Sequence, residues 1–231
     1  HFGIKLLPPH LIKSDMDFTT EGDDIRFGLL SIKGVSDKSI EKLYDFKKDY
    51  SCKFEIFQAA QEAKIGLGVL CPLIQAGALE GFRQSRTKVV YEAQIWSILT
   101  VREKRWVLDF GEEYDYDLVK IIKHLTVFKA DKDKPIIKES RIGTIKKRSE
   151  LYKKIYEINN KSQVFANWYY ENLLLGYTYG KTLIDIYQPL KPNDTLMSGR
   201  RVDEADIDDR ICFVGVVKEV YSGTSKNGND Y

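Results

Sequence analysis

Apolar residues recur at helical spacing through the first half of the chain. Ile25, Leu29 and Ile32 are four and three residues apart, and a similar spacing resumes after Gly34. Such spacing places one apolar face along a helix, so it predicts helical structure over residues 25–48 with a break at Gly34. The same reasoning predicts three more helices: residues 54–64, residues 69–75, and a long helix over residues 85–108 that Ser85 caps.

The flanking segments carry other patterns. Residues 1–24 contain Pro8-Pro9 and many turn-forming aspartates and glycines, which favour an irregular, extended lead. Residues 111–116 are acidic and predict a loop, and residues 118–127 fit either a short helix or a strand. A charged linker is expected at residues 130–145, with helices at 150–156 and 165–177.

The C-terminal end changes to a strand pattern. Residues 211–221 are rich in valine, and Asn227-Gly228 follows as a hairpin signal. A second strand should come next, but the sequence stops at Tyr231, so we expect a truncated domain here. The fold class predicted is therefore mostly α with a small β part. The predicted divisions are an extended lead (1–24), a helical domain (25–110), a mixed charged linker and helical segment (111–200), and the start of a further β domain (207–231).

Composition narrows the classes of protein. Of the 231 residues, 43% are hydrophobic and 30% charged, which supports a packed core and not wholesale disorder. The 36 lysines and arginines against 34 acids give a net charge of +2, which excludes a globally basic nucleic-acid coat but not a local basic face. No apolar run is long enough to span a membrane, and no signal peptide is evident. The three scattered cysteines predict no zinc site, and they favour the reducing cytoplasm.

The most informative segment is LLSIKGVSDKSIEKL, residues 29–43. It reads as helix, a turn centred on Gly34, and helix, with Ile32 and Val35 anchoring the turn. Gly34 permits a backbone conformation that a side chain resists, and the start of the second helix leaves amide N–H groups free to bind a phosphate oxygen. The candidate DNA-binding residues here are Lys33, Gly34, Val35, Ser36 and Lys38. Such a contact reads the DNA backbone and is independent of sequence. The alternative is a turn that serves packing only.

A second candidate hairpin lies at residues 73–81, where Gly77 sits between apolar residues. Arg83, Arg86 and Lys88 follow it and complete a second candidate DNA-binding set. A glycine that merely ends a helix is the alternative.

Residues 138–154 hold seven basic and two acidic residues, a local net charge of +5 (7 − 2). Lys146, Lys147 and Arg148 are its densest part and are candidates for phosphate contact. A solvated helix face is the alternative. The aromatic residues that follow, from Trp168 to Tyr179, have the spacing of a helix packed into a core.

Several segments in order resemble the bacterial DNA polymerase III alpha subunit, a C-family DNA polymerase. They are GIKLLPPHLIKSDMDF (3–18), IRFGLLSIKGVSDKSIEKL (25–43), KFEIFQAA (53–60), CPLIQAGALEGFRQSR (71–86) and WYYENLLLGYTYGKTL (168–183). Two departures stand out: Ser36 replaces the glycine of the family's hairpin, and Lys181-Thr182 replace His-Pro. The resemblance implies tandem helix-hairpin-helix motifs that grip duplex DNA behind the active site, followed by the first strand of an OB-fold. The resemblance implies a cytoplasmic location at the nucleoid and replisome, or the host cytoplasm if the parent polymerase is phage-encoded.

Under this resemblance the chain is a non-catalytic, duplex-DNA-binding part of a nucleotidyltransferase. The palm aspartates of the family do not occur, and no histidine pair forms a metal site. We therefore expect no catalytic residue, cofactor or small-molecule substrate in this fragment, and Mg²⁺ only in the parent polymerase. Double-stranded DNA is the expected partner. The sliding clamp is a further expected partner, with Gln163-Val164-Phe165 as a short echo of a clamp-binding segment. The alternative function is a protein-interaction scaffold of the replisome, in which the hairpins are structural turns.

Overall fold

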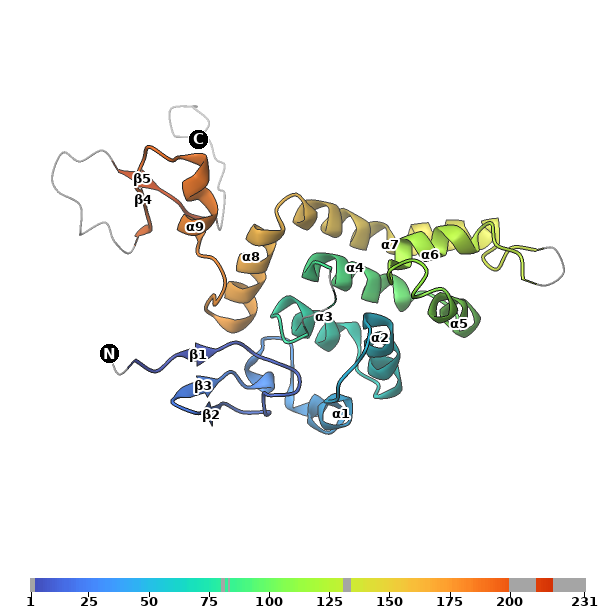
Figure 1. Ribbon diagram of the computed structural model, residues 1–231, viewed down its shortest axis with the longest axis horizontal. Helices are drawn as coiled ribbons and strands as arrows, with labels where there is room; N and C mark the ends of the chain where they lie inside the picture. The colour runs from blue at the N-terminus through green and yellow to red at the C-terminus, as the bar shows by residue number, and fades with distance from the viewer. Residues whose placement is uncertain (1–2, 80–81, 83, 131–133, 200–210, 218–231) are drawn as a thin grey trace, which may run out of the picture. The chain divides into compact units, whose positions relative to one another are not determined.

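The computed structural model describes residues 3–79, 82, 84–130, 134–199 and 211–217 (Figure 1). The chain divides into two compact units, His1–Gly180 and Lys181–Tyr231. The domain boundaries inferred from the sequence stay a prediction. The fold class is confirmed, because helices dominate the described residues and strands are short.

The N-terminal lead is not irregular, as the sequence suggested, but forms a small sheet. Strands β1 (Leu6–Leu7), β2 (Thr19–Glu21) and β3 (Asp24–Arg26) are arranged in the order β1-β3-β2. β1 is parallel to β3, and β2 is antiparallel to it across the tight turn at Gly22. The helix expected from residue 25 is therefore wrong at its start, because residues 24–26 already pair with strands on both sides.

Only short helical segments surround Gly34. The 3₁₀ helix η1 (Leu29–Ser31) precedes it, and the 3₁₀ helix η2 (Asp37–Ser39) runs directly into α1 (Ile40–Phe46). The backbone before η1 is closely packed, since a Cβ on Gly28 would lie 2.4 Å from the carbonyl carbon of Asp17. The first arm of the hairpin is thus a single helical turn rather than the longer helix that the spacing predicted.

The helical body follows from α2 (Lys53–Glu62) to α5. The predicted helices at 54–64 and 69–75 are confirmed as α2 and α3 (Leu67–Gln75). The long helix predicted over 85–108 is wrong: the chain forms α4 (Arg86–Trp96) and α5 (Val101–Asp109). Ser85 caps α4 as predicted, with its Oγ accepting from the Lys88 amide. The break arises because Thr100 and Glu103 form a capping box that starts a new helix.

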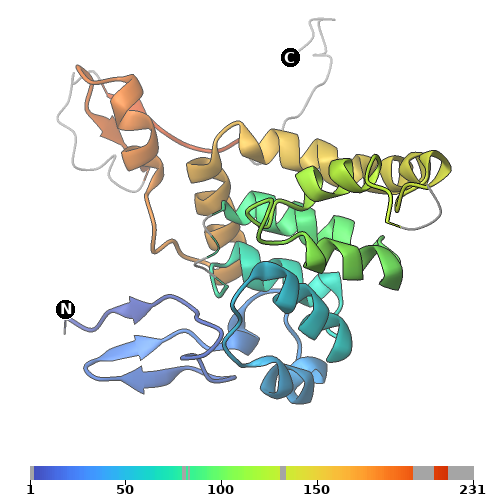
Figure 2. The same cartoon turned by 45° about the vertical axis from the view of Figure 1, so that its right-hand side comes forward.

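Three helices complete the first unit (Figure 2). The ambiguous segment after the acidic turn is α6 (Leu118–Leu125), a helix that Asp117 caps. The charged linker expected up to residue 145 is shorter than predicted, because α7 (Glu139–Asn160) begins inside it. α8 (Gln163–Leu175) ends at Gly176, whose φ of +76° closes the helix in the left-handed region.

The core lies among α2, α3, α4 and the neighbouring helices. Phe54, Phe57 and Trp96 are at most 3% exposed, and the rings of Phe54 and Trp96 stack at 5.6 Å between centroids. α4 packs against α3 on one side and α7 on the other. This arrangement makes α4 the central element of the body.

The second unit contains α9 (Leu183–Tyr187), the 3₁₀ helix η3 (Gln188–Leu190), and strands β4 (Leu196–Met197) and β5 (Cys212–Phe213), which pair in parallel. Residues 211–217 of the strand predicted over residues 211–221 are described, and among them only Cys212–Phe213 form a strand. Asn227-Gly228 lies outside the described residues. The start of an OB-fold stays a prediction. In the described parts of the chain, no helix has the length and apolarity that crossing a bilayer requires.

Candidate nucleic-acid interface at the Gly34 hairpin

The hairpin turn is built on a buried base and a left-handed glycine. Ile32 is 0% exposed and Val35 is 7% exposed, and the Val35 amide donates to the Ile32 carbonyl at 2.9 Å. Gly34 between them has φ +98°, a conformation that L-residues rarely adopt. The anchoring roles predicted for Ile32 and Val35, and the need for glycine at position 34, are confirmed.

Two helices hold the hairpin in place from behind. The Lys33 amide donates to the carbonyl oxygen of Leu174 in α8 at 2.9 Å. A Cβ on Gly34 would lie 3.2 Å from Cγ of Pro72 in α3. The turn therefore rests on α3 and α8, and its position depends on both.

The outer side of the hairpin is open to solvent and carries two lysines and one acidic residue, Asp37. Lys33, Gly34 and Lys38 are exposed, and among the residues that the structure describes neither lysine forms an ion pair. The amides of Ser36, Asp37 and Lys38 have no hydrogen-bond acceptor in the described part of the chain, as expected at a helix start. Ser36 occupies the N-cap of η2, and its side chain makes no capping bond. Exposed amides and two free ammonium groups together form a surface suited to anions.

The second candidate hairpin is covered by protein. Gly77, between α3 and α4, has φ +83° and is buried. A Cβ there would lie 1.9 Å from the Tyr179 hydroxyl and 2.6 Å from Nη2 of Arg86. The Tyr179 hydroxyl donates to the Ala76 carbonyl at 2.8 Å and accepts from Arg86 Nη2 at 2.8 Å. Among its described residues, 73–79, this hairpin offers no exposed backbone comparable to that at Gly34.

The cations that follow Gly77 have partners within the fold. Arg86 Nη1 lies 2.7 Å from Oε1 of the buried Glu171. Lys88 Nζ lies 3.4 Å from Glu92 Oε1 and 3.4 Å from Asp117 Oδ1. Arg83 lies outside the described residues. A role of this second set in DNA binding stays a prediction.

A buried charge cluster beneath α4 was not anticipated from the sequence. Lys53 Nζ contacts Glu92 Oε2, and both side chains are at most 1% exposed. Burial lowers the pKa of Lys53 and raises the pKa of Glu92. Oε1 of Glu92 also accepts from the Leu118 amide at 3.1 Å. The only sequence signal was Glu92 within the short segment VVYEA of α4, whose other residues are apolar or aromatic. The cluster joins α2, α4 and α6.

The basic residues of α7 lie apart from the hairpin. Lys146, Lys147 and Arg148 are exposed. Both views show α7 and α1 on opposite sides of the α3–α4 layer (Figures 1 and 2). The structure therefore does not bring this basic segment and the Gly34 hairpin together into one patch.

The described residues contain no group of three or more histidine, cysteine or acidic side chains placed to hold a metal ion. The described residues therefore offer no ligand set for the Mg²⁺ expected of a parent polymerase.

Comparison with known families identifies the class of the N-terminal region. Residues 3–89, which include both glycine hairpins, match the family model described as a helix-hairpin-helix motif.

The curated relatives include DNA polymerase III alpha subunits and an error-prone DNA polymerase. The chain is 34% identical over 94 residues to the DNA polymerase III subunit alpha of Aquifex aeolicus. The aligned segment covers 38% of this chain and 8% of that protein. It is 29% identical over 108 residues to the subunit from Saccharopolyspora erythraea (45% of this chain, 9% of that protein). It is 28% identical over 100 residues to the error-prone DNA polymerase of Bdellovibrio bacteriovorus (42% and 9%).

These matches confirm the resemblance to DNA polymerase III alpha subunits over about two fifths of the chain. The matched region covers less than a tenth of the length of these relatives.

Proposed function

We propose that this chain binds duplex DNA through the Gly34 hairpin, without sequence preference, as a non-catalytic part of a replicative DNA polymerase. The observation that carries the proposal is the exposed Gly34 turn with φ +98°, flanked by the unpaired Lys33 and Lys38. The helix-hairpin-helix match over residues 3–89 supports it.

The chemistry of the surface favours phosphate over bases. Amide N–H groups at Ser36, Asp37 and Lys38 can donate to a phosphate oxygen, and the lysines add positive charge on either side of the turn. The hairpin carries no exposed aromatic ring or amide side chain between residues 29 and 39 that could read a base edge. Affinity should therefore depend on salt and not on DNA sequence.

The test is a fluorescence anisotropy titration of labelled duplex DNA at two salt concentrations. Each lysine that meets a phosphate contributes about 0.9 to the slope of log K against log salt. The Lys33→Glu plus Lys38→Glu variant should therefore flatten the slope by about 2 and weaken binding at least tenfold at low salt.

The matched control is Lys120→Glu plus Lys123→Glu. These two lysines are exposed on α6, and their replacement changes the net charge by the same −4. Equal binding by the wild type and the hairpin variant, or an equal loss in both variants, would reject the hairpin as the contact. A second duplex of unrelated sequence should bind within about a factor of three of the first.

Docking of a sliding clamp is a second proposal, favoured by the position of Gln163 and Val164. Both are exposed in the first turn of α8, and Val164 is 45% exposed. A pull-down with the purified clamp, using Gln163→Ala plus Val164→Asp, tests it. If this variant still retains the clamp, residues 163–165 are not the clamp contact.

A further inference from the structure

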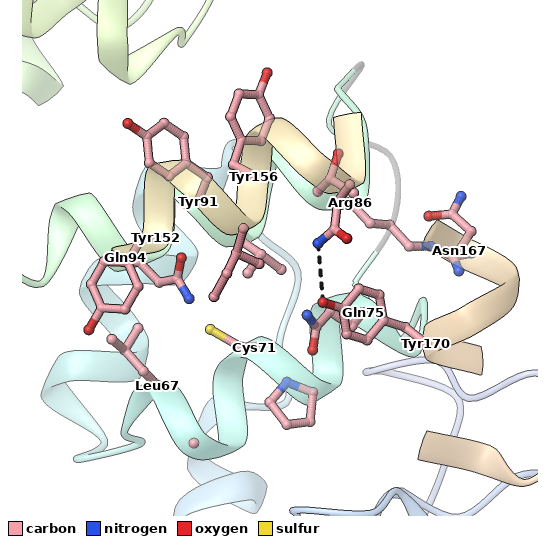
Figure 3. A pocket seen from close by; sticks show the side chains of 16 residues that line it. Leu67, Cys71, Gln75, Arg86, Tyr91, Gln94, Tyr152, Tyr156, Asn167 and Tyr170 are labelled. Carbon is pink, nitrogen blue, oxygen red and sulfur yellow. Dashed lines mark hydrogen bonds between the residues drawn. The ribbon is translucent and has the colours of Figure 1, made fainter. Parts of the chain in front are cut away.

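A groove runs between helices α3 and α7. α4 forms its floor and α8 closes one end (Figure 3). Its volume is about 360 Å³, which is in the range of pockets that bind organic groups. Leu67 and Cys71 line it from α3, Tyr152 and Ile155 from α7, and Tyr170 from α8.

The walls of the groove are mainly aromatic and aliphatic, with some polar groups left free. The rings of Tyr91 and Tyr156 stack with centroids 4.8 Å apart and planes 7° apart. Gln75 and Gln94 also line the groove, and in the described part of the chain their side-chain amides have no hydrogen-bond partner. The groove can therefore accept an apolar side chain and still donate and accept hydrogen bonds at its edge.

An apolar stripe on α7 borders this groove. Leu151, Ile155 and Ile158 are 65%, 40% and 66% exposed. Their spacing of four and three residues aligns them along one face of the helix. Ile155 itself lines the groove, so the stripe continues the apolar surface of the groove outward along α7.

The next strip around α7 is basic. At about 100° per residue, Lys147 and Lys154 fall beside Leu151 and Ile158, on the side away from the groove. Both lysines are exposed, and the only ion pair of Lys154 among the described residues is with the exposed Glu150 of the same helix. Such a pair is weak and exchangeable. α7 has six basic and three acidic residues, a net charge of +3 (6 − 3), whereas α3 on the opposite wall has no charged residue.

From this order of groove, apolar stripe and lysines, we infer that this surface docks an acidic amphipathic α-helix of a partner protein. One large apolar side chain of the partner enters the groove, others of its apolar face pack on Leu151 and Ile158, and its acidic flank meets Lys147 and Lys154. This mode presents apolar anchors at positions i, i+4 and i+7. A nucleic-acid backbone is disfavoured here, because three exposed aliphatic side chains would lie against phosphates. The anchors on α7 are not residues of the proposed DNA contact, although Pro72, which lines the groove, also lies against Gly34.

The experiment uses the whole chain and a synthetic helical peptide of about five turns. The peptide carries leucine at i, i+4 and i+7 and glutamate along one flank, with a fluorescent label for anisotropy. We expect a Kd of about 10 μM. The Leu151→Asp plus Ile158→Asp variant should weaken binding at least tenfold. The Lys147→Glu plus Lys154→Glu variant should weaken it about fivefold at low salt, and less at high salt.

Matched controls keep the result specific. The Val101→Asp plus Val127→Asp variant also introduces two aspartates, at two exposed valines that do not line the groove. Val101 is 80% and Val127 is 73% exposed. This variant should bind the peptide like the wild type. Thermal melting checks that each variant is folded, and duplex DNA binding should be unchanged in the Leu151→Asp plus Ile158→Asp variant.

Four results would overturn the inference. The first is no binding of the acidic peptide, and the second is equal binding of a peptide with a lysine flank. The third is loss of duplex DNA affinity in Leu151→Asp plus Ile158→Asp, which would assign the surface to nucleic acid. The fourth is self-association of the wild type that the same variant abolishes, which would assign it to a second copy of this chain.

Discussion

The backbone amide of Lys33 donates to the carbonyl oxygen of Leu174 at 2.9 Å. Leu174 lies in the last turn of α8, where carbonyl groups lack partners within the helix. The bond therefore gives the Leu174 carbonyl a hydrogen-bond donor and at the same time fixes the tip of the Gly34 hairpin. Because of this link, the proposed DNA contact depends on an element far away in the sequence.

Gly34→Ala should lower the free energy of unfolding by about 1–2 kcal/mol, because an L-residue is strained at φ +98°. The added Cβ would also press on Pro72 at 3.2 Å. Gly143→Ala is the matched control. Gly143 lies inside α7 with open space around it, so this change should stabilise the protein by about 0.5–1 kcal/mol. Urea unfolding measures both, and two changes of the same sign would contradict the strain at Gly34.

Glu171→Ala should destabilise the first unit by about 3 kcal/mol, because it removes the ion pair between Glu171 and the largely buried guanidinium of Arg86. Glu171 Oε2 also accepts from the amides of Tyr179 and Gly180. Urea unfolding of the variant gives the size of the loss.

Glu171→Gln serves as the comparison for this change. It keeps one oxygen acceptor for the two amides but loses the charge, so it should cost less than the alanine change. A loss below about 1 kcal/mol for Glu171→Ala would mean that the Arg86 network is not a stabilising link.

The pH dependence of stability should report on Glu103. Burial opposes its ionisation, but hydrogen bonds from the Arg141 side chain and from Thr100 prevail and lower the pKa of Glu103 below 4.5. A carboxyl whose pKa is lower in the folded state contributes stability above its unfolded pKa, and this contribution is lost as the pH falls through the folded value.

Glu103→Gln should therefore make unfolding less sensitive to acid below about pH 4.5, with lower stability than wild type near neutral pH. Thermal melting from pH 7 to about pH 3 measures this. Parallel curves for the two proteins would show that Glu103 titrates alike in the folded and unfolded states.

The Lys146→Glu plus Lys147→Glu plus Arg148→Glu variant tests the DNA contact predicted for α7. We expect a loss of DNA affinity smaller than that of the Lys33 and Lys38 double variant, because α7 lies on the other side of the α3–α4 layer (Figure 1). Anisotropy at low salt compares the two. A larger loss for the α7 variant would move the main DNA contact to that helix.

Local patterns predicted much of the hairpin and of the helical body. The apolar spacing located α2 and α3, and the isolated glycine between Ile32 and Val35 indicated a left-handed turn with a buried base. These features depend on neighbours in sequence, so spacing and residue type are sufficient. The prediction of one long helix over residues 85–108 is wrong because helical spacing continues across residues 97–100, whereas the capping box of Thr100 and Glu103 starts a new helix there.

The primary sequence thus specified the helical class, the family resemblance and the turn at Gly34, since these follow from side-chain period and backbone preference. It could not distinguish Gly34 from Gly77, two left-handed glycines in similar surroundings of sequence. That distinction comes from packing over long distances: Tyr179 and Arg86 cover Gly77, whereas α3 and α8 support Gly34 from behind and leave it exposed. Which residues meet across the fold depends on how the helices pack, and the spacing of residues along one helix does not contain that information.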